Sequence, residues 1–157
     1  MTLAAAVTTA AALRDELQAE VVRSREERVV LRSLDGGRIQ ARMEERLEFI
    51  ERTEHLQRQL RVAQSAAAQA LGLTDATADS IARLVPREGG LLVELLGQVR
   101  ALASTLSELA ALNQSLAERA LGCTRAYTRA MAPRPTAYGR LGAPPPAAAL
   151  AAVSRRA

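Results

Sequence analysis

A run of residues at heptad spacing between Leu91 and Met131 constrains the fold of this chain more than any other segment. Apolar positions and one asparagine follow one another in steps of three and four: Leu92, Leu95, Val99, Leu102, Leu106, Leu109, Asn113, Leu116, Ala120, Cys123 and Tyr127. This heptad seam has a mean step of about 3.5 residues, the period at which a helix presents a narrow apolar side to a partner helix. The run therefore predicts one helix of about 41 residues, or about 60 Å at the helical rise.

The ends of this helix and the width of its apolar side can also be predicted. Gly89 and Gly90 are expected to separate this helix from the element before it, and Pro133 is expected to end the helix. Leu112 and Leu121 lie beside the heptad seam, so the C-terminal half of the helix has more apolar width than one partner helix would cover.

Two other long helices are predicted earlier in the chain, over about 3–34 and 38–71. Asp35-Gly36-Gly37 forms the turn between them, and Gly72 is the expected C-cap of the second. The charged run over 23–28 is predicted to be a solvated face, because acids and bases alternate within it. The apolar positions that mark the packing side of the second helix are Ile39, Met43, Leu47, Ile50, Leu56 and Leu60.

These patterns predict an all-α fold over residues 1–132, an elongated antiparallel three-helix bundle or coiled coil. A short helix over 75–85 is expected before the long one, capped by Thr74 or Asp75 and ended by Pro86. Residues 133–157 are rich in proline and alanine, lack apolar periodicity and are predicted to be a flexible, disordered tail. Because the last helix is longer than the other two, its C-terminal end should offer an apolar surface to a partner or a second copy.

Composition argues against several classes of protein. No stretch of about 18 uncharged apolar residues exists, so no membrane insertion is expected, and the uncharged N-terminus lacks the basic segment of a signal peptide. His55 is the only histidine, and Cys123 is the only cysteine. With no second ligand at metal-binding spacing and no base near a nucleophile, the sequence predicts no enzyme activity, no metal and no cofactor.

The net charge of +4 is unevenly distributed. Residues 14–61 hold 11 Arg and 11 acidic residues, whereas residues 119–157 hold seven Arg and no acid. Such a basic end attracts phosphate in a salt-dependent way. Nucleic-acid binding is nevertheless not the favoured interpretation, because no aromatic residues interleave with the arginines to stack on bases.

Three segments together resemble the FlgN family of flagellar export chaperones. LAALNQSLAERAL, which runs from Leu109 to Leu121, is similar to the C-terminal signature of that family. TAYGRLG, which starts at Thr136, resembles the Thr-Tyr-Gly-x-x-Gly motif that follows the signature. LDGGRIQA, which starts at Leu34, resembles the Gly-Asp turn of the family.

The resemblance implies a cytoplasmic chaperone for the hook–filament junction proteins FlgK and FlgL. Such a chaperone holds its client unassembled and delivers it to the flagellar type III export gate. A client helix whose apolar face is buried in the filament needs that face covered beforehand, and helix-in-groove packing would cover it. The predicted client-binding residues are Leu106, Leu109, Leu112, Asn113, Leu116, Ala120, Leu121 and Tyr127.

Individual residues have predicted roles and alternatives. Asn113, a polar group in the seam, would fix the register of packing. Tyr138 and Gly139 are predicted to dock on the export apparatus. For Leu106 and Leu109 the alternative is burial in the core of the protein itself. For the whole protein the alternative is a structural or adaptor coiled coil that dimerises through the helix over 91–131.

Overall fold

The computed structural model describes residues 3–132, which form four α-helices: α1 (Leu3–Ser33), α2 (Gly36–Ala70), α3 (Ala78–Leu84) and α4 (Pro86–Met131). Contacts divide the chain into one compact unit that ends at Ala120 and a second that begins at Leu121. No strand occurs within the described range, and the predicted all-α fold is confirmed. The predicted tail over 133–157, with Tyr138 and Gly139, lies outside the described residues.

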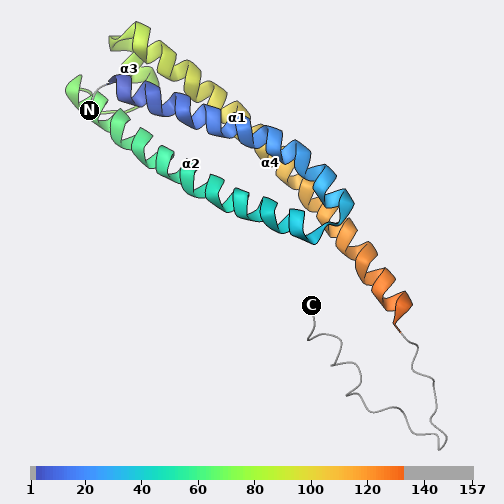
Figure 1. The fold of residues 1–157 in the computed structure, drawn as a ribbon. Coiled ribbons are helices and arrows are strands. Elements are labelled where there is room, and N and C mark those ends of the chain that lie inside the picture. The colour runs from blue at the N-terminus through green and yellow to red at the C-terminus, as the bar shows by residue number, and fades with distance from the viewer. Residues whose placement is uncertain (1–2, 133–157) are drawn as a thin grey trace, which may run out of the picture. The chain divides into compact units, whose positions relative to one another are not determined.

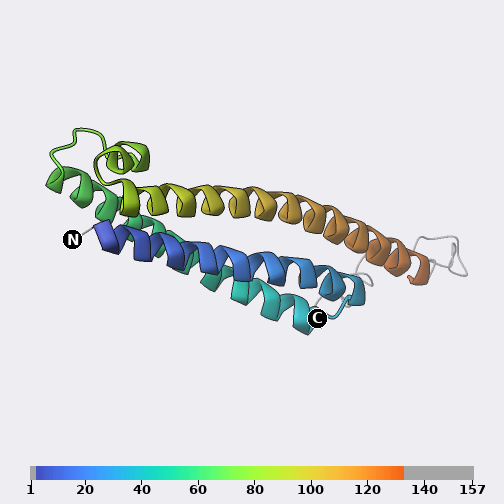
Figure 2. The same cartoon turned by 90° about the horizontal axis from the view of Figure 1, so that it is seen from above.

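The first unit is a bundle of three long helices. α1 and α2 are antiparallel neighbours joined by a tight turn, and α4 up to Ala120 runs back alongside them (Figures 1 and 2). α3 lies at the end of the bundle where α1 begins and α2 ends (Figure 1). The predicted antiparallel three-helix bundle is therefore correct for this unit.

The residues predicted to form the turns at the two ends of α2 are found there. Asp35 is the N-cap of α2, and its carboxylate accepts a hydrogen bond from the Arg38 amide at 3.2 Å. At the other end of α2, Gly72 has a φ of 69°, in the left-handed region that favours glycine. The amides of Gly72 and Leu73 donate to the carbonyls of Gln69 and Ala68, which is the Schellman arrangement.

The predictions for the cap of α3 and for the start of α4 were wrong in detail. Thr77, not Thr74 or Asp75, caps α3 by accepting a hydrogen bond from the Ser80 amide. Pro86 does not merely end α3: it is the first residue of α4, because proline has no amide hydrogen to leave unpaired at a helix start. Gly89 and Gly90 therefore lie inside α4, which begins five residues before the predicted Leu91.

The apolar core occupies the part of the bundle that contains α3. It combines small alanine side chains of α1 and α2 with larger leucine and isoleucine side chains, and the alanines let the helices approach closely. Its buried members are Ala6, Ala10, Leu13, Leu17, Leu60, Ala63, Ala67, Ile81, Leu92 and Leu95.

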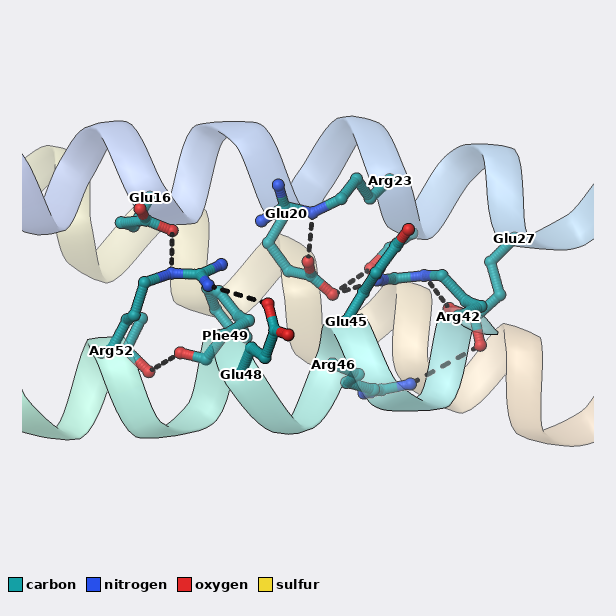
Figure 3. Close-up of polar contacts among 12 residues, drawn as sticks. Glu16, Glu20, Arg23, Glu27, Arg42, Glu45, Arg46, Glu48, Phe49 and Arg52 are labelled. Atoms are coloured by element: carbon teal, nitrogen blue, oxygen red, sulfur yellow. Dashed lines mark hydrogen bonds and ion pairs between the residues drawn. The ribbon is translucent and has the colours of Figure 1, made fainter. Parts of the chain in front are cut away.

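In the rest of the bundle, buried polar side chains accompany the buried Val21 and Leu109, and we call this region the polar interior. Glu20 is buried between α1 and α2 and forms ion pairs with Arg42 and, at 2.8 Å, with Arg23 (Figure 3). Ser24, Thr53 and Asn113 are buried as well. The prediction that residues 23–28 form a solvated face was therefore only partly right, because this segment also supplies polar side chains to the interior.

Candidate partner-binding surface

The heptad seam of α4 changes from buried to exposed along the helix. In the first unit Leu92, Leu95 and Leu109 are buried. In the second unit Cys123 and Tyr127 continue the same spacing, and both are exposed. An apolar seam at heptad spacing that is not covered is a surface on which another helix can pack.

The predicted client-binding residues of the first unit differ in exposure. Leu109 and Asn113 are buried, whereas Leu106, Leu116 and Ala120 are half-buried. Leu106 also packs against the apolar core. Leu112 is exposed. Of these six residues, two are therefore in the interior, three are partly accessible and one, Leu112, is exposed.

Asn113 is held by a set of polar contacts with α1. Its side-chain amide donates to the Ser24 carbonyl at 2.8 Å and to the Glu27 carboxylate at 3.2 Å. Its side-chain oxygen accepts a hydrogen bond from Arg28 Nε at 3.4 Å. Because these contacts need one alignment of the two helices, Asn113 fixes the register of α4 on α1 within the protein itself.

Residues 121–132 of the second unit are exposed throughout. Three of them, which we call the terminal face, give this segment an apolar side: Cys123, Tyr127 and Met131. Leu121, two residues before Cys123, lies on a different side of the helix. Tyr127 and Met131 are adjacent on the helix at a spacing of four, and are 65% and 66% exposed. Arg125 and Arg129 are the charged residues of this segment, and they suit the negative end of the helix dipole.

Met131 was not among the predicted site residues. The signal that would have identified it is its spacing of four from Tyr127, which continues the steps of three and four. Leu121 and Tyr127 were predicted, and the structure places both on exposed surface.

A second apolar surface was missed altogether. Met43, Leu47 and Ile50 mark the expected packing side of α2, yet all three are exposed. Arg42 and Thr53 take the buried positions in this part of the helix. The interpretation of the whole apolar row of α2 as a packing side was therefore wrong for these three residues, and correct for Leu60.

Within residues 3–132, no group of three or more His, Cys, Asp or Glu residues could hold a metal ion. His55 is exposed and shares a hydrogen bond with Gln59 at 2.9 Å. No helix in this range is both long enough and apolar enough to cross a membrane.

Comparison with known proteins gives one match. The model of a family described as FlgN protein matches residues 5–146, which is most of the 157-residue chain. No curated protein and no solved structure matches the chain.

Proposed function

This chain belongs to the FlgN family of flagellar export chaperones, and we propose that it binds hook–filament junction proteins of the FlgK and FlgL type. It keeps a terminal helix of the client covered in the cytoplasm, prevents premature assembly and delivers the client to the flagellar type III export gate. The client helix packs on the terminal face, and the exposed Leu112 in the first unit is a separate apolar contact for the client.

The observation that carries this proposal is the exposure of the terminal face. Transfer of a large apolar side chain from water into a packed interface contributes about 1.5–3 kcal/mol when burial is complete. Tyr127 and Met131 are both available for that transfer. An amphipathic client helix that buries its own apolar stripe against them gains on both sides of the interface.

The buried residues of the predicted site have a different part in this proposal. Leu109 and Asn113 are inaccessible in the free protein, so a client would reach them only if α1 moved away from α4. We assign them to the interior, where they hold α4 in register. Leu116 and Ala120, which are half-buried, border the client contact.

Replacement of Tyr127 by Glu tests this surface. A buried charge without a partner opposes binding, so Tyr127→Glu should weaken binding of a purified FlgK- or FlgL-type protein by about tenfold or more. Leu112→Glu should act in the same direction. Binding is measured by isothermal titration calorimetry, and the helical circular dichroism of each variant should match that of the wild type because both side chains are exposed.

Leu91→Glu is the control for Tyr127→Glu. Leu91 is on the same helix and is also exposed, at 45% against 65% for Tyr127, so a general effect of adding charge to α4 would appear in both variants. Equal client affinity for wild type and Tyr127→Glu would show that the client surface lies elsewhere.

The second candidate function is a structural or adaptor coiled coil. The observation that favours it is the continuation of the heptad seam through Cys123 and Tyr127, because two copies of such a seam can pair. Sedimentation over a range of concentrations separates the two functions. A scaffold stays dimeric with or without client, whereas a chaperone forms a complex of defined stoichiometry with its client.

A further inference from the structure

An apolar stripe on α2 faces outward in the part of the bundle that has the polar interior. We call Met43, Leu47 and Ile50 the α2 stripe; their spacing of four and three places them on one side of the helix. All three are exposed. Single exposed apolar residues are ordinary on protein surfaces, but a continuous row on one helix indicates a surface that packs against something else.

The polar interior explains why the α2 stripe is not used inside the bundle. The side of α2 that faces α1 carries Arg42, which pairs with the buried Glu20, and Arg52, which lies 3.4 Å from Glu16 (Figure 3). With charged groups between the helices, the apolar side chains of this part of α2 point elsewhere. The three side chains of the stripe therefore remain exposed on the outside of the bundle.

A small hollow at the Met43 end of the α2 stripe has room for a side chain of a guest helix. It has a volume of about 210 Å³ and brings together residues of three helices, namely Val30 and Leu31 of α1, Ile39 and Met43 of α2, and Ala117 of α4, with Glu27 and Arg42 at its polar side. Apart from those two charged residues, its lining is apolar. The small side chain of Ala117 allows close approach on the α4 side.

The charges around the α2 stripe indicate what kind of helix fits. Residues 43–54 hold five Glu and two Arg. Both arginines are already engaged, Arg46 with Glu27 at 3.7 Å and Arg52 with Glu16 and Glu48. Glu44 and Glu51 each directly follow a stripe residue and are exposed, so the stripe is bordered by acidic side chains.

We infer that the α2 stripe is a second docking site of the chaperone, for an amphipathic helix of the client that carries Lys or Arg along one edge. Its apolar side covers Met43, Leu47 and Ile50, and its basic edge faces Glu44 and Glu51. The inference rests on the proposed function, because it takes the client as the source of the helix. It assigns to that client a contact separate from the terminal face.

Two variants test the apolar and the charged parts of this site in the full-length protein. Leu47→Glu should weaken binding of a purified FlgK- or FlgL-type client by about tenfold. Glu44→Lys/Glu51→Lys should weaken it at low salt, and the difference from wild type should shrink toward 1 M salt, where charges are screened beyond about 3 Å. Val62→Glu and Glu94→Lys are the controls. Val62 is on α2 and is 55% exposed, against 63% for Leu47, and Glu94 is an exposed acid of α4.

The outcomes separate this inference from the proposed function. If Tyr127→Glu weakens client binding while Leu47→Glu and the double Lys variant bind like wild type, the second site is refuted and the proposed function stands. If wild type binds neither client type, both fail. If Leu47→Glu abolishes self-association of the free protein and leaves client affinity unchanged, the α2 stripe joins two copies and the inference is wrong.

Discussion

Gly89 is the residue at which α4 packs directly against α3. A Cβ atom at this position would lie 2.5 Å from the Ala82 Cα and 2.7 Å from its amide nitrogen. Both atoms belong to the backbone, so no side-chain rotation could relieve the contact. The glycine is therefore required by close approach of two helices, although it lies in a helix where glycine is intrinsically unfavourable.

Replacement of Gly89 by Ala should destabilise the protein by about 1–3 kcal/mol, the usual cost of overpacking. Its neighbour Gly90 is the control, since a Cβ there meets nothing within 4 Å. Gly90→Ala should stabilise the protein by about 0.5–1 kcal/mol through helix propensity. Urea unfolding followed by circular dichroism measures both. Destabilisation of similar size by the two substitutions would contradict the close-approach explanation.

Glu20 and Arg42 form the most deeply buried ion pair in the described residues, with side chains only 2% and 8% exposed. Arg23 and Ser24 also contact the Glu20 carboxylate, at 2.8 Å and 3.4 Å. Burial of charges costs desolvation energy that the pairing only partly returns. We therefore expect the pair to specify how α1 and α2 align more than to raise the stability of the bundle.

Arg42→Met should destabilise the protein by about 3 kcal/mol, because it leaves the Glu20 charge buried with fewer partners. The double variant Glu20→Leu/Arg42→Met should cost clearly less than the sum of the two single variants, since neither charge then remains. Urea unfolding of all four proteins gives the coupling free energy. The exposed pair Arg58–Glu54, 60% exposed on both sides, is the comparison, and Arg58→Met should cost less than about 1 kcal/mol. Simple additivity at Glu20 and Arg42 would contradict this account.

At the scale of helices, the sequence patterns predicted α4 well because a long heptad seam leaves few alternatives. The seam identifies the helix, and the burial of Leu92, Leu95 and Leu109 follows it. What the pattern could not predict was the start of the helix. A Gly-Gly pair ordinarily interrupts a helix. Here Gly89 lies in close contact with Ala82 of α3, and this tertiary contact cannot be predicted from the local sequence.

For α2 the same reasoning failed where a charged side chain is buried and apolar side chains are exposed. Periodicity assumes that apolar residues face inward, whereas Met43 and Leu47 face outward and Arg42 faces inward. The signal was present in the sequence as a spacing conflict. Arg42, Phe49, Thr53 and Leu60 also follow one another in helical steps, but a row with an arginine and a threonine is not chosen as a core when an all-apolar row lies beside it.

At the scale of the molecule, the division into an apolar and a polar part of the bundle corresponds to two tasks. The apolar part around α3 carries most of the buried hydrophobic residues and so supplies the stability. The polar part leaves its apolar side chains outside, at the α2 stripe, and the terminal face is exposed in the second unit. In the proposed function, the apolar residues that the bundle does not bury are the ones that the client covers.

Removal of the tail should separate client binding from delivery. A chain that ends at Ala132 keeps the terminal face and the α2 stripe, so its affinity for a FlgK- or FlgL-type client should equal that of the full chain. It loses Tyr138 and Gly139, the predicted contact with the export apparatus, so secretion of the client should fall. Calorimetry with the purified client and secretion from a strain carrying the shortened gene measure the two properties.

A chain that ends at Gly142 is the control for this truncation, because it keeps Tyr138 and Gly139 and removes only the last residues of the tail. It should restore secretion to the level of the full chain, and Tyr138→Ala in the full chain should lower secretion without changing client affinity. These outcomes follow if one short segment makes the contact with the export apparatus. Normal secretion by the chain that ends at Ala132 would remove Tyr138 from the mechanism, and a loss of client affinity in that chain would place part of the client contact in the tail.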